Sequence, residues 1–323
     1  MDRVEPNDPD VARTLPRRVL EVVRRERLWA PGDRVAVGVS GGLDSTVLIE
    51  VLARTVGAHG GRLEVVSVDH KLRAASAAEV VGVGRHAQAL GLPFRAVTLD
   101  IAPGPDLASR CREARRAALA AGGGDRIATG HHQDDQAETV LHHLLRGAGL
   151  DGLQGMRIAN GRWVRPLLTT PREMLRMFAH LEALQWVEDP SNAASLRGRM
   201  RALMPALDAL HGGAGPALAR SAGLLAQDAA FVDEQADAAW RRCAVHGGLD
   251  LARLRGEPPA LQARALRRLI LVHLSMVRAD HIGAALRWIH RPQGRLGLPG
   301  GWGLVVRDGL LWVASAAQGR GDG

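Results

Sequence analysis

The stretch Ser40-Gly41-Gly42-Leu43-Asp44-Ser45-Thr46 decides how this chain is interpreted. It follows residues 34–39, a valine-rich run that predicts a buried strand, and it precedes residues 47–54, which predict a helix. Two glycines let the backbone turn tightly and approach a ligand, while the N–H groups and positive dipole end of the helix face the same point. A strand, a turn of small residues and a helix in this order predict a phosphate-binding loop.

Asp44 distinguishes this loop from that of kinases, which carry a lysine just before the Ser or Thr. An aspartate beside phosphates is repelled unless a positive group lies between them, so Asp44 favours a bridging Mg²⁺ or a cationic substrate group. The pattern resembles the SGGxDS loop of ATP-pyrophosphatases, which split ATP into AMP and pyrophosphate. The alternative is a simple strand-to-helix turn in which Asp44 caps the helix.

Length and composition narrow the class of protein. The 323 residues are enough for two domains, and a hydrophobic fraction of 46% is typical of a globular protein. Residues 1–13 are polar and no apolar run is long enough to cross a bilayer, so we expect a cytoplasmic protein with no membrane partner. Cys111 and Cys243 are the only cysteines and lie far apart, which excludes a CxxC pair and a cysteine-built iron–sulfur or zinc cluster.

The positive charge is carried almost entirely by arginine. The formal net charge is +8, and Lys71 is the only lysine. The planar guanidinium binds two phosphate oxygens at once and stays charged, so the composition favours a nucleic-acid partner. The alternative is a compositional bias towards alanine, glycine and arginine, with the arginines solvated.

Strands and helices alternate through the first half of the sequence. We expect strands at residues 34–39, 63–70, 94–99 and 126–129, and helices at 15–28, 47–54, 77–90 and 106–121. This order predicts an α/β fold with a doubly wound parallel sheet, in which ligands lie at the carboxyl ends of the strands.

Three segments that are distant in sequence should meet at that edge of the sheet: residues 40–46, residues 68–70, and residues 130–139. In the last segment Asp134, Asp135 and Glu138 enter a predicted helix, with Asp134 and Glu138 spaced to share one face. Together with His131 and His132, these acids suit Mg²⁺ or an ammonium group. The alternative is that the acids only favour a helix N-terminus beside a solvated histidine pair.

The rest of the chain is predicted in less detail. Residues 146–156 are too rich in glycine for a helix and predict a mobile loop. A helix is expected at 171–184, a linker at 212–216, helices at 217–242, 260–273 and 280–290, and a hairpin around Asp308-Gly309. We therefore expect a first domain at 1–211, ordered over about 15–205, and a smaller, mainly helical domain at 216–323.

Six segments, in order, resemble one family. They are SGGxDS at 40–45, VDHxLR at 68–73, GHHxDDQxET at 130–139, RGxGxxGLxGM at 146–156, RPLL at 165–168 and DxSN at 189–192. Together they are similar to tRNA(Ile)-lysidine synthase, over roughly residues 35–205. Two departures put local substrate contacts in doubt: residues 197–201 lack the asparagine of the family's arginine-asparagine pair, and Ala118 lies near a position where relatives carry an aromatic residue.

The resemblance implies an adenine-nucleotide-hydrolase-like PP-loop domain followed by a tRNA-binding domain. The implied reaction uses ATP and Mg²⁺ to adenylate the C2 oxygen of the wobble cytidine of tRNA(Ile), after which free L-lysine displaces AMP and forms lysidine; a homodimer is allowed. The implied nucleotide-binding residues are Ser40, Gly41, Gly42, Leu43, Asp44, Ser45, Asp69, His70 and Gly130. The catalytic candidates are Asp44, His131, Asp134, Asp135 and Glu138, with Asp44, Asp134 and Asp135 as metal ligands.

Arginines that follow the catalytic segments are candidates for tRNA binding. Between residues 157 and 201 there are eight arginines against four acids, which suggests a track for phosphates. From this excess and the family motifs we select Arg146, Arg197, Arg199 and Arg201.

Three other functions share parts of the pattern. A tRNA thiolation enzyme uses the same loop but commonly needs paired cysteines. A small-molecule adenylating synthetase of the amidotransferase type would not call for an arginine-rich second domain. A non-catalytic nucleotide-binding regulator would keep Gly41 and Gly42 without needing Asp134, Asp135 and Glu138 together.

Overall fold

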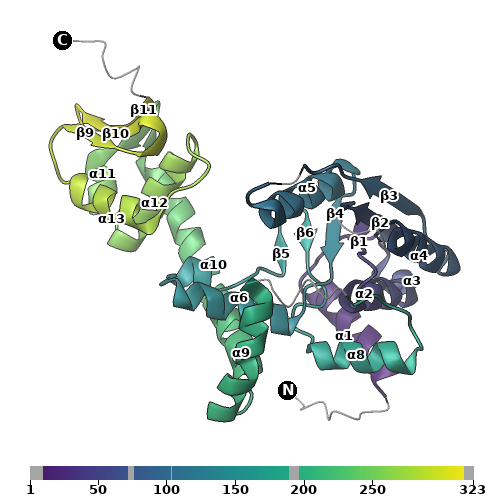
Figure 1. Ribbon diagram of the computed structural model, residues 1–323. Helices are drawn as coiled ribbons and strands as arrows, with labels where there is room; N and C mark the ends of the chain where they lie inside the picture. The colour runs from purple at the N-terminus through teal and green to yellow at the C-terminus, as the bar shows by residue number, and fades with distance from the viewer. Residues whose placement is uncertain (1–9, 72–75, 103, 189–195, 316–323) are drawn as a thin grey trace. The chain divides into compact units, whose positions relative to one another are not determined.

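The computed structural model describes residues 10–71, 76–102, 104–188 and 196–315. The chain divides into two compact units, Met1–Ala226 and Gln227–Gly323 (Figure 1). The predicted DxSN segment at 189–192 and the end of the VDHxLR segment, residues 72 and 73, lie outside the described residues. Within the described ranges, no helix is both long and apolar enough to span a bilayer.

The first unit is built on a six-stranded sheet of order β3-β2-β1-β4-β6-β5. Its strands are β1 (Arg34–Gly38), β2 (Arg62–Asp69), β3 (Phe94–Thr98), β4 (Arg126–Thr129), β5 (Ala159–Asn160) and β6 (Trp163–Val164). All neighbouring strands pair in parallel except β5 and β6. The expected parallel sheet is confirmed, and its strand order reverses direction between β1 and β4, where ligands bind in open α/β sheets.

Helices cover both faces of this sheet (Figure 1). The helices of the first unit are α1 (Val11–Arg25), α2 (Leu43–Arg54), α3 (Val56–His59), α4 (Ser76–Ala89), α5 (Leu107–Ala121), α6 (Gln133–Leu145), α7 (Leu150–Leu153), α8 (Arg172–Leu181) and α9 (Leu196–Leu210). Of these, α7 and α9 pack against α6. Alternate residues of β1 point to opposite faces of the sheet, and each face has its own hydrophobic core. Val35 and Val37 pack with α1, α2, α4 and α8, whereas Ala36 packs on the other face with Leu119 of α5.

Several elements differ from the expectation. Helix α2 begins at Leu43, inside the loop motif, because Leu43 and residues 45–52 are buried against the sheet. The glycine-rich segment contains the short helix α7 rather than only a loop. Strands β5 and β6 and helix α9 were not predicted at all. Each of these strands has two residues, and α9 carries Pro205 in its interior, which argues against a helix in the sequence.

The second unit combines helices with a five-stranded sheet of order β7-β8-β11-β10-β9. Its elements are α10 (Ala214–Cys243), which begins in the first unit, β7 (Ala244–Val245), β8 (Gly248–Asp250), α11 (Leu251–Gly256), α12 (Pro259–Leu271), α13 (Ala279–Trp288), β9 (Gly294–Gly297), β10 (Trp302–Arg307) and β11 (Leu310–Ser315). The sheet buries Leu304, Val306 and Leu311 against the helices.

The structure contains the predicted hairpin, but a helix begins where the linker was expected. Strands β10 and β11 pair in antiparallel register, and Asp308 and Gly309 have φ values of 52° and 77°, as a tight turn with two left-handed residues requires. The expected linker at 212–216 instead leads into α10, which starts at Ala214. The division between the compact units falls inside this helix, after Ala226.

Candidate active site

The Ser40–Thr46 segment forms a tight turn between β1 and α2. Gly41 has a φ of +80°, which favours glycine, and Val187 N–H donates to the Gly41 carbonyl at 2.9 Å. Ser45 Oγ accepts from Ser40 N–H at 3.1 Å and donates to the Gly42 carbonyl at 3.0 Å. No side chain caps α2, so the N–H groups of its first turn remain available to an anion. The predicted phosphate-loop geometry is therefore present.

Gly130 fixes the distance between this loop and the segment after β4. A Cβ at Gly130 would lie 3.0 Å from the backbone carbonyl of Asp44 and 3.1 Å from Ser45 N. Only a glycine allows so close an approach, because the contacting atoms are backbone atoms at the start of α2. The two segments that the sequence assigned to one edge of the sheet are thus in direct contact.

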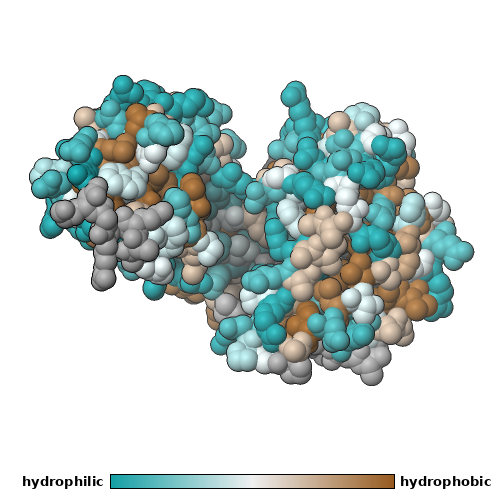
Figure 2. Space-filling model, turned by 90° about the horizontal axis from the view of Figure 1, so that it is seen from above, coloured by the Kyte–Doolittle hydropathy of each residue, from teal (hydrophilic) through white to brown (hydrophobic). Residues whose placement is uncertain are grey.

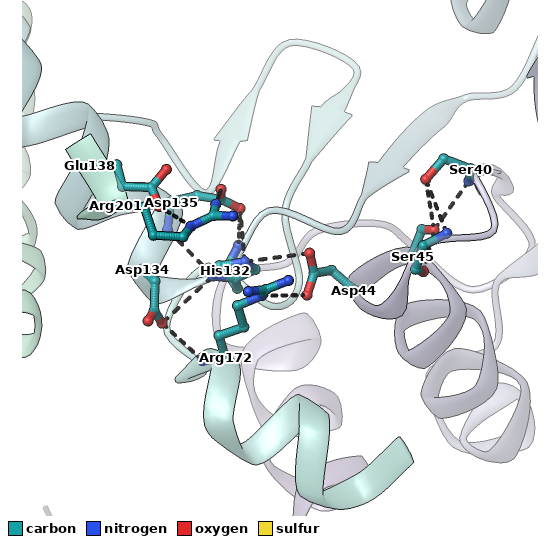
Figure 3. Close-up of polar contacts among 10 residues, drawn as sticks. Ser40, Asp44, Ser45, His132, Asp134, Asp135, Glu138, Arg172 and Arg201 are labelled. Atoms are coloured by element: carbon teal, nitrogen blue, oxygen red, sulfur yellow. Dashed lines mark hydrogen bonds and ion pairs between the residues drawn. The ribbon is translucent and has the colours of Figure 1, made fainter. Parts of the chain in front are cut away.

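His132 lies at the centre of the carboxylates (Figure 3). Its Nε2 is 3.5 Å from Asp44 Oδ2 and 3.3 Å from Asp135 Oδ2, and its Nδ1 is 3.7 Å from Asp134 Oδ2. The side chain is only 1% exposed. His132 is also the N-cap of α6, since its backbone N–H donates to Asp135 Oδ2 at 3.1 Å. The sequence selected His131, whose Nδ1 instead lies 3.0 Å from Thr129 Oγ1.

The carboxylates keep His132 charged. Burial by itself would lower the pKa of His132, but Asp134, Asp44 and Asp135 outweigh it and raise the pKa to about 9. In the charged ring Nδ1–H faces Asp134, and the long 3.4 Å approach of Asp135 N–H to Nδ1 is no longer a hydrogen bond. Burial would likewise raise the pKa values of Asp44 and Asp134, but their contacts with His132 keep both below the ordinary value.

Arg172 connects these acids to α8. Its backbone N–H donates to Asp134 Oδ2 at 2.9 Å, so Asp134 caps α8, whose N-cap residue Pro171 makes no side-chain cap. Its Nε lies 3.5 Å from Asp44 Oδ1. Asp44 belongs to α2, so this contact joins the N-terminal ends of α2 and α8. At their C-terminal ends, Arg54 of α2 pairs with Glu182, which directly follows α8. Asp134 therefore has a structural role in addition to any role in the reaction.

Glu138 and Asp135 share a second arginine. Arg201 of α9 donates from Nε to Glu138 Oε1 at 2.7 Å, and its Nη2 is 4.0 Å from Asp135 Oδ1 (Figure 3). The Glu138 side chain is 1% exposed and that of Arg201 is 41% exposed. Arg201 was selected from the sequence for tRNA binding, which stays a prediction; in the structure its partly exposed side chain also neutralises a buried carboxylate.

Gln136, a residue of the GHHxDDQxET segment for which the sequence predicted no role, holds the glycine-rich segment onto α6. Its Oε1 accepts from Met156 N–H at 2.7 Å, and its Nε2 donates to the carbonyls of Gln154 and Met156 at 3.2 and 3.1 Å. His143 Nδ1 lies 2.6 Å from the Gly152 carbonyl. The segment is thereby attached to the helix that carries the acids. A glutamine within a run of acids at a helix start was the available signal.

The other selected residues lie at the same edge or on the surface. Asp69 Oδ1 accepts from Lys71 N–H at 2.8 Å, which holds the pKa of Asp69 below its ordinary value. Burial, followed by nearby Arg115, lowers the pKa of His70. Arg146 follows α6 and is exposed, as is Arg199 on α9. Arg197 lies on α9, with its side chain outside the described part of the structure.

The donor types around Asp44 fit Mg²⁺, although the arrangement is not a three-ligand cage. Within the described ranges, no three His, Cys, Asp or Glu side chains are arranged to hold a metal ion. Mg²⁺ usually binds through one or two carboxylates together with substrate phosphates and water. Asp44, which lies within the phosphate loop in the first turn of α2, matches that requirement.

The sheet order, the loop after β1 and the acids after β4 define a PP-loop protein, and the PP-loop domain family matches residues 12–207. The U34-tRNA thiolase NcsA of Methanococcus maripaludis has the same fold, with a TM-score of 0.56 at 21% identity over 67% of this chain and 78% of that one. At that level of identity the similarity supports the fold alone.

Sequence relatives define the family more closely. A tRNA(Ile)-lysidine synthase of Pseudomonas syringae is 34% identical over 93% of this chain and 75% of its own length, and one of Streptomyces coelicolor is 39% identical over 85% of both. A tRNA(Ile)-lysidine synthase of Alkalilimnicola ehrlichii is 36% identical over 89% of this chain, and the match covers 64% of that relative's length. The chain belongs to the tRNA(Ile)-lysidine synthase family, whose members are ligases.

Proposed function

We propose that this protein uses ATP to join free L-lysine to C2 of the wobble cytidine of tRNA(Ile), with release of AMP and pyrophosphate. The observation that carries the proposal is the contact between the Ser40–Thr46 loop and the acid-bearing segment at Gly130. An ATP molecule whose β- and γ-phosphates are held by the loop would have its α-phosphorus close to Asp44 and His132. Membership of a family of lysidine synthases supports this choice of substrates.

The first step forms a bond between the cytidine O2 and the α-phosphorus and breaks the bond to pyrophosphate. The N–H groups at the start of α2, the Ser40 and Ser45 hydroxyls and charged His132 would stabilise the negative charge that moves onto pyrophosphate. Mg²⁺, held by Asp44 and phosphate oxygens, would neutralise more of that charge. The anticodon base must be turned outwards, which costs little in a single-stranded loop.

In the second step the lysine side-chain nitrogen bonds to C2, and the C2–O2 bond breaks as AMP leaves. The amine loses protons in the process, so a nearby carboxylate is needed. With His132 charged, the cluster holds the carboxylates of Asp44, Asp134, Asp135 and Glu138 against His132, Arg172 and Arg201. Counted without the metal and the phosphates, these side chains carry a single net negative charge, which favours an incoming cation. We assign Asp135 and Glu138 to the lysine and Asp44 to the metal, with Asp134 able to join either.

The proposed intermediate can be tested by omitting lysine. ATP labelled at the α-phosphate should then transfer its label to tRNA(Ile) as pyrophosphate is released, and later addition of lysine should release labelled AMP. Label that never reaches the tRNA, or ADP as the stoichiometric product, would contradict this order of steps.

A further inference from the structure

The chain returns to the phosphate loop after helix α8. Helices α2 and α8 lie side by side, and the pair between Arg54 and Glu182 joins their C-terminal ends. The backbone then turns at Ala183, whose φ is +48°, and the residues that follow form neither helix nor strand. We call residues 184–187 the return segment. It leads from the end of α8 back to the loop, which it reaches at Gly41.

The return segment has little slack. The 12 residues of α2 rise about 18 Å, and the chain has to cover a similar distance between Glu182 and the loop. The five residue steps from Glu182 to Val187 span at most about 18 Å when fully extended. The burial pattern is also that of an extended chain, since Leu184 and Trp186 pack against the core and the residues that alternate with them are exposed. The position of the segment beside the loop is therefore closely defined.

A backbone hydrogen bond joins the return segment to the loop. Val187 N–H donates to the Gly41 carbonyl at 2.9 Å. In a trans peptide the C=O and the following N–H point in opposite directions, so this bond directs the Gly42 N–H away from Val187. That N–H faces Ser40 Oγ at 3.5 Å, too far for a strong hydrogen bond, and Ser40 Oγ lies 3.2 Å from Ser45 Oγ (Figure 3). The Gly42 N–H thus points to the side of the loop where the hydroxyls gather and stays available to an anion.

The side chain of Val187 matters less than its backbone. It is 40% exposed, and Figure 2 shows hydrophobic residues exposed among hydrophilic ones on the face that it draws. An exposed apolar side chain is therefore ordinary in this protein and does not by itself mark a binding surface. The neighbouring Trp186 holds the backbone in place, because its ring packs against the core and lies edge-on to His180, with ring centroids 5.2 Å apart.

We propose that the return segment positions the phosphate loop: the Val187 N–H, anchored by Trp186, aims the Gly42 N–H at the β- and γ-phosphates of ATP. A peptide between two glycines rotates easily, and Gly41 already has a φ of +80°, so a bond from outside the loop fixes its orientation. The alternative is that the segment only covers the core, in which case its loss would affect all ligands alike. This inference rests on the proposed function for the identity of the nucleotide.

The test compares variants that differ in one backbone N–H. Val187→Pro removes the donor and Val187→Ala keeps it, while Gln185→Pro puts proline in the same segment where, within the described ranges, the N–H donates no hydrogen bond. Calorimetry on the full chain measures the affinities for ATP, pyrophosphate and AMP in the presence of Mg²⁺. We expect Val187→Pro to bind ATP and pyrophosphate roughly tenfold more weakly, as for a lost hydrogen bond to a charged group. It should bind AMP as the parent does, because AMP lacks the phosphates that the loop holds. The other two variants should match the parent.

A second pair of variants keeps the test decisive if Val187→Pro does not fold. Trp186→Ala loosens the anchor and should weaken ATP and pyrophosphate binding several-fold at the parental AMP affinity. Trp186→Phe keeps a ring beside His180 and should restore parental binding. Equal losses in the two proline variants, equal losses for AMP and ATP, or parental pyrophosphate binding in Trp186→Ala would overturn the inference.

These binding measurements need neither tRNA nor lysine, so they separate the inference from the proposed function. If the parent forms lysidine and Val187→Pro binds pyrophosphate as the parent does, only the positioning role is wrong. If the parent forms no lysidine and Val187→Pro loses affinity for pyrophosphate but not for AMP, the positioning role holds and the proposed reaction fails.

Discussion

Arg201 Nε lies 2.7 Å from Glu138 Oε1, so an arginine of α9 neutralises a carboxylate that is almost fully buried on α6. The pair joins α9 to the helix that carries the acids. It therefore gives Arg201 a structural role in the site, and the selection of Arg201 for tRNA binding stays a prediction, as it does for Arg146, Arg197 and Arg199.

We expect Arg201→Gln to destabilise the first unit by about 2 kcal/mol, because it removes the positive charge that neutralises the buried Glu138 carboxylate; the partial exposure of Arg201 keeps the cost below that of a fully buried pair. Urea unfolding measures the change. Arg199→Gln, on the exposed side of the same helix, should alter the free energy of unfolding by less than about 0.5 kcal/mol. Equal effects of the two substitutions would mean that the Arg201–Glu138 pair contributes nothing.

Asp44→Asn should leave the fold intact and strongly reduce pyrophosphate release, because an amide does not neutralise Mg²⁺ and weakens the contacts to His132 and Arg172. The assay is tRNA-dependent pyrophosphate release at saturating ATP. Asp208→Asn, on the exposed part of α9, serves as a control. Pyrophosphate release at the parental rate by the Asp44 variant would remove Asp44 from the reaction.

The raised pKa of His132 predicts a pH dependence of stability in the metal-free protein. Because the folded pKa of about 9 exceeds the ordinary value of 6.5, folding binds a proton more tightly. The contribution of His132 is fully present below pH 6.5 and is lost as the pH rises towards 9. Urea unfolding between pH 6 and pH 10 should show this loss in the parent and not in His132→Gln. Parallel curves would indicate that His132 is neutral in the folded protein.

Gln136→Ala should release the glycine-rich segment from α6. It leaves the Met156 N–H and two carbonyls without their side-chain partner, at a cost of roughly 1–3 kcal/mol. Hydrogen exchange at Met156 should accelerate accordingly. Gln185→Ala is the matched control, since that side chain makes only a 3.5 Å contact. Unchanged exchange at Met156 would show that the segment is held by other contacts.

Local patterns were sufficient to predict the centre of the fold. Buried runs of valine gave β1 and β2, and the glycine pair after β1 gave the phosphate loop. Elements that depend on pairing between distant segments could not be predicted. Strands β5 and β6 are examples, because each has two residues and forms only by continuing the sheet beyond β4. His131 and His132 are adjacent and chemically identical, so only the cap geometry of α6 distinguishes them. The inward direction of Arg201 likewise depends on the packing of α9 against α6.

The most direct test of the proposed function is incorporation of labelled lysine. The purified protein is incubated with ATP, labelled L-lysine and either tRNA(Ile) bearing a wobble cytidine or the same tRNA with uridine at that position. We expect one lysine per cytidine-bearing tRNA, equimolar AMP and pyrophosphate, and no label on the uridine variant. Absence of label from the cytidine-bearing tRNA, while the protein still binds ATP and tRNA, would contradict the proposed function.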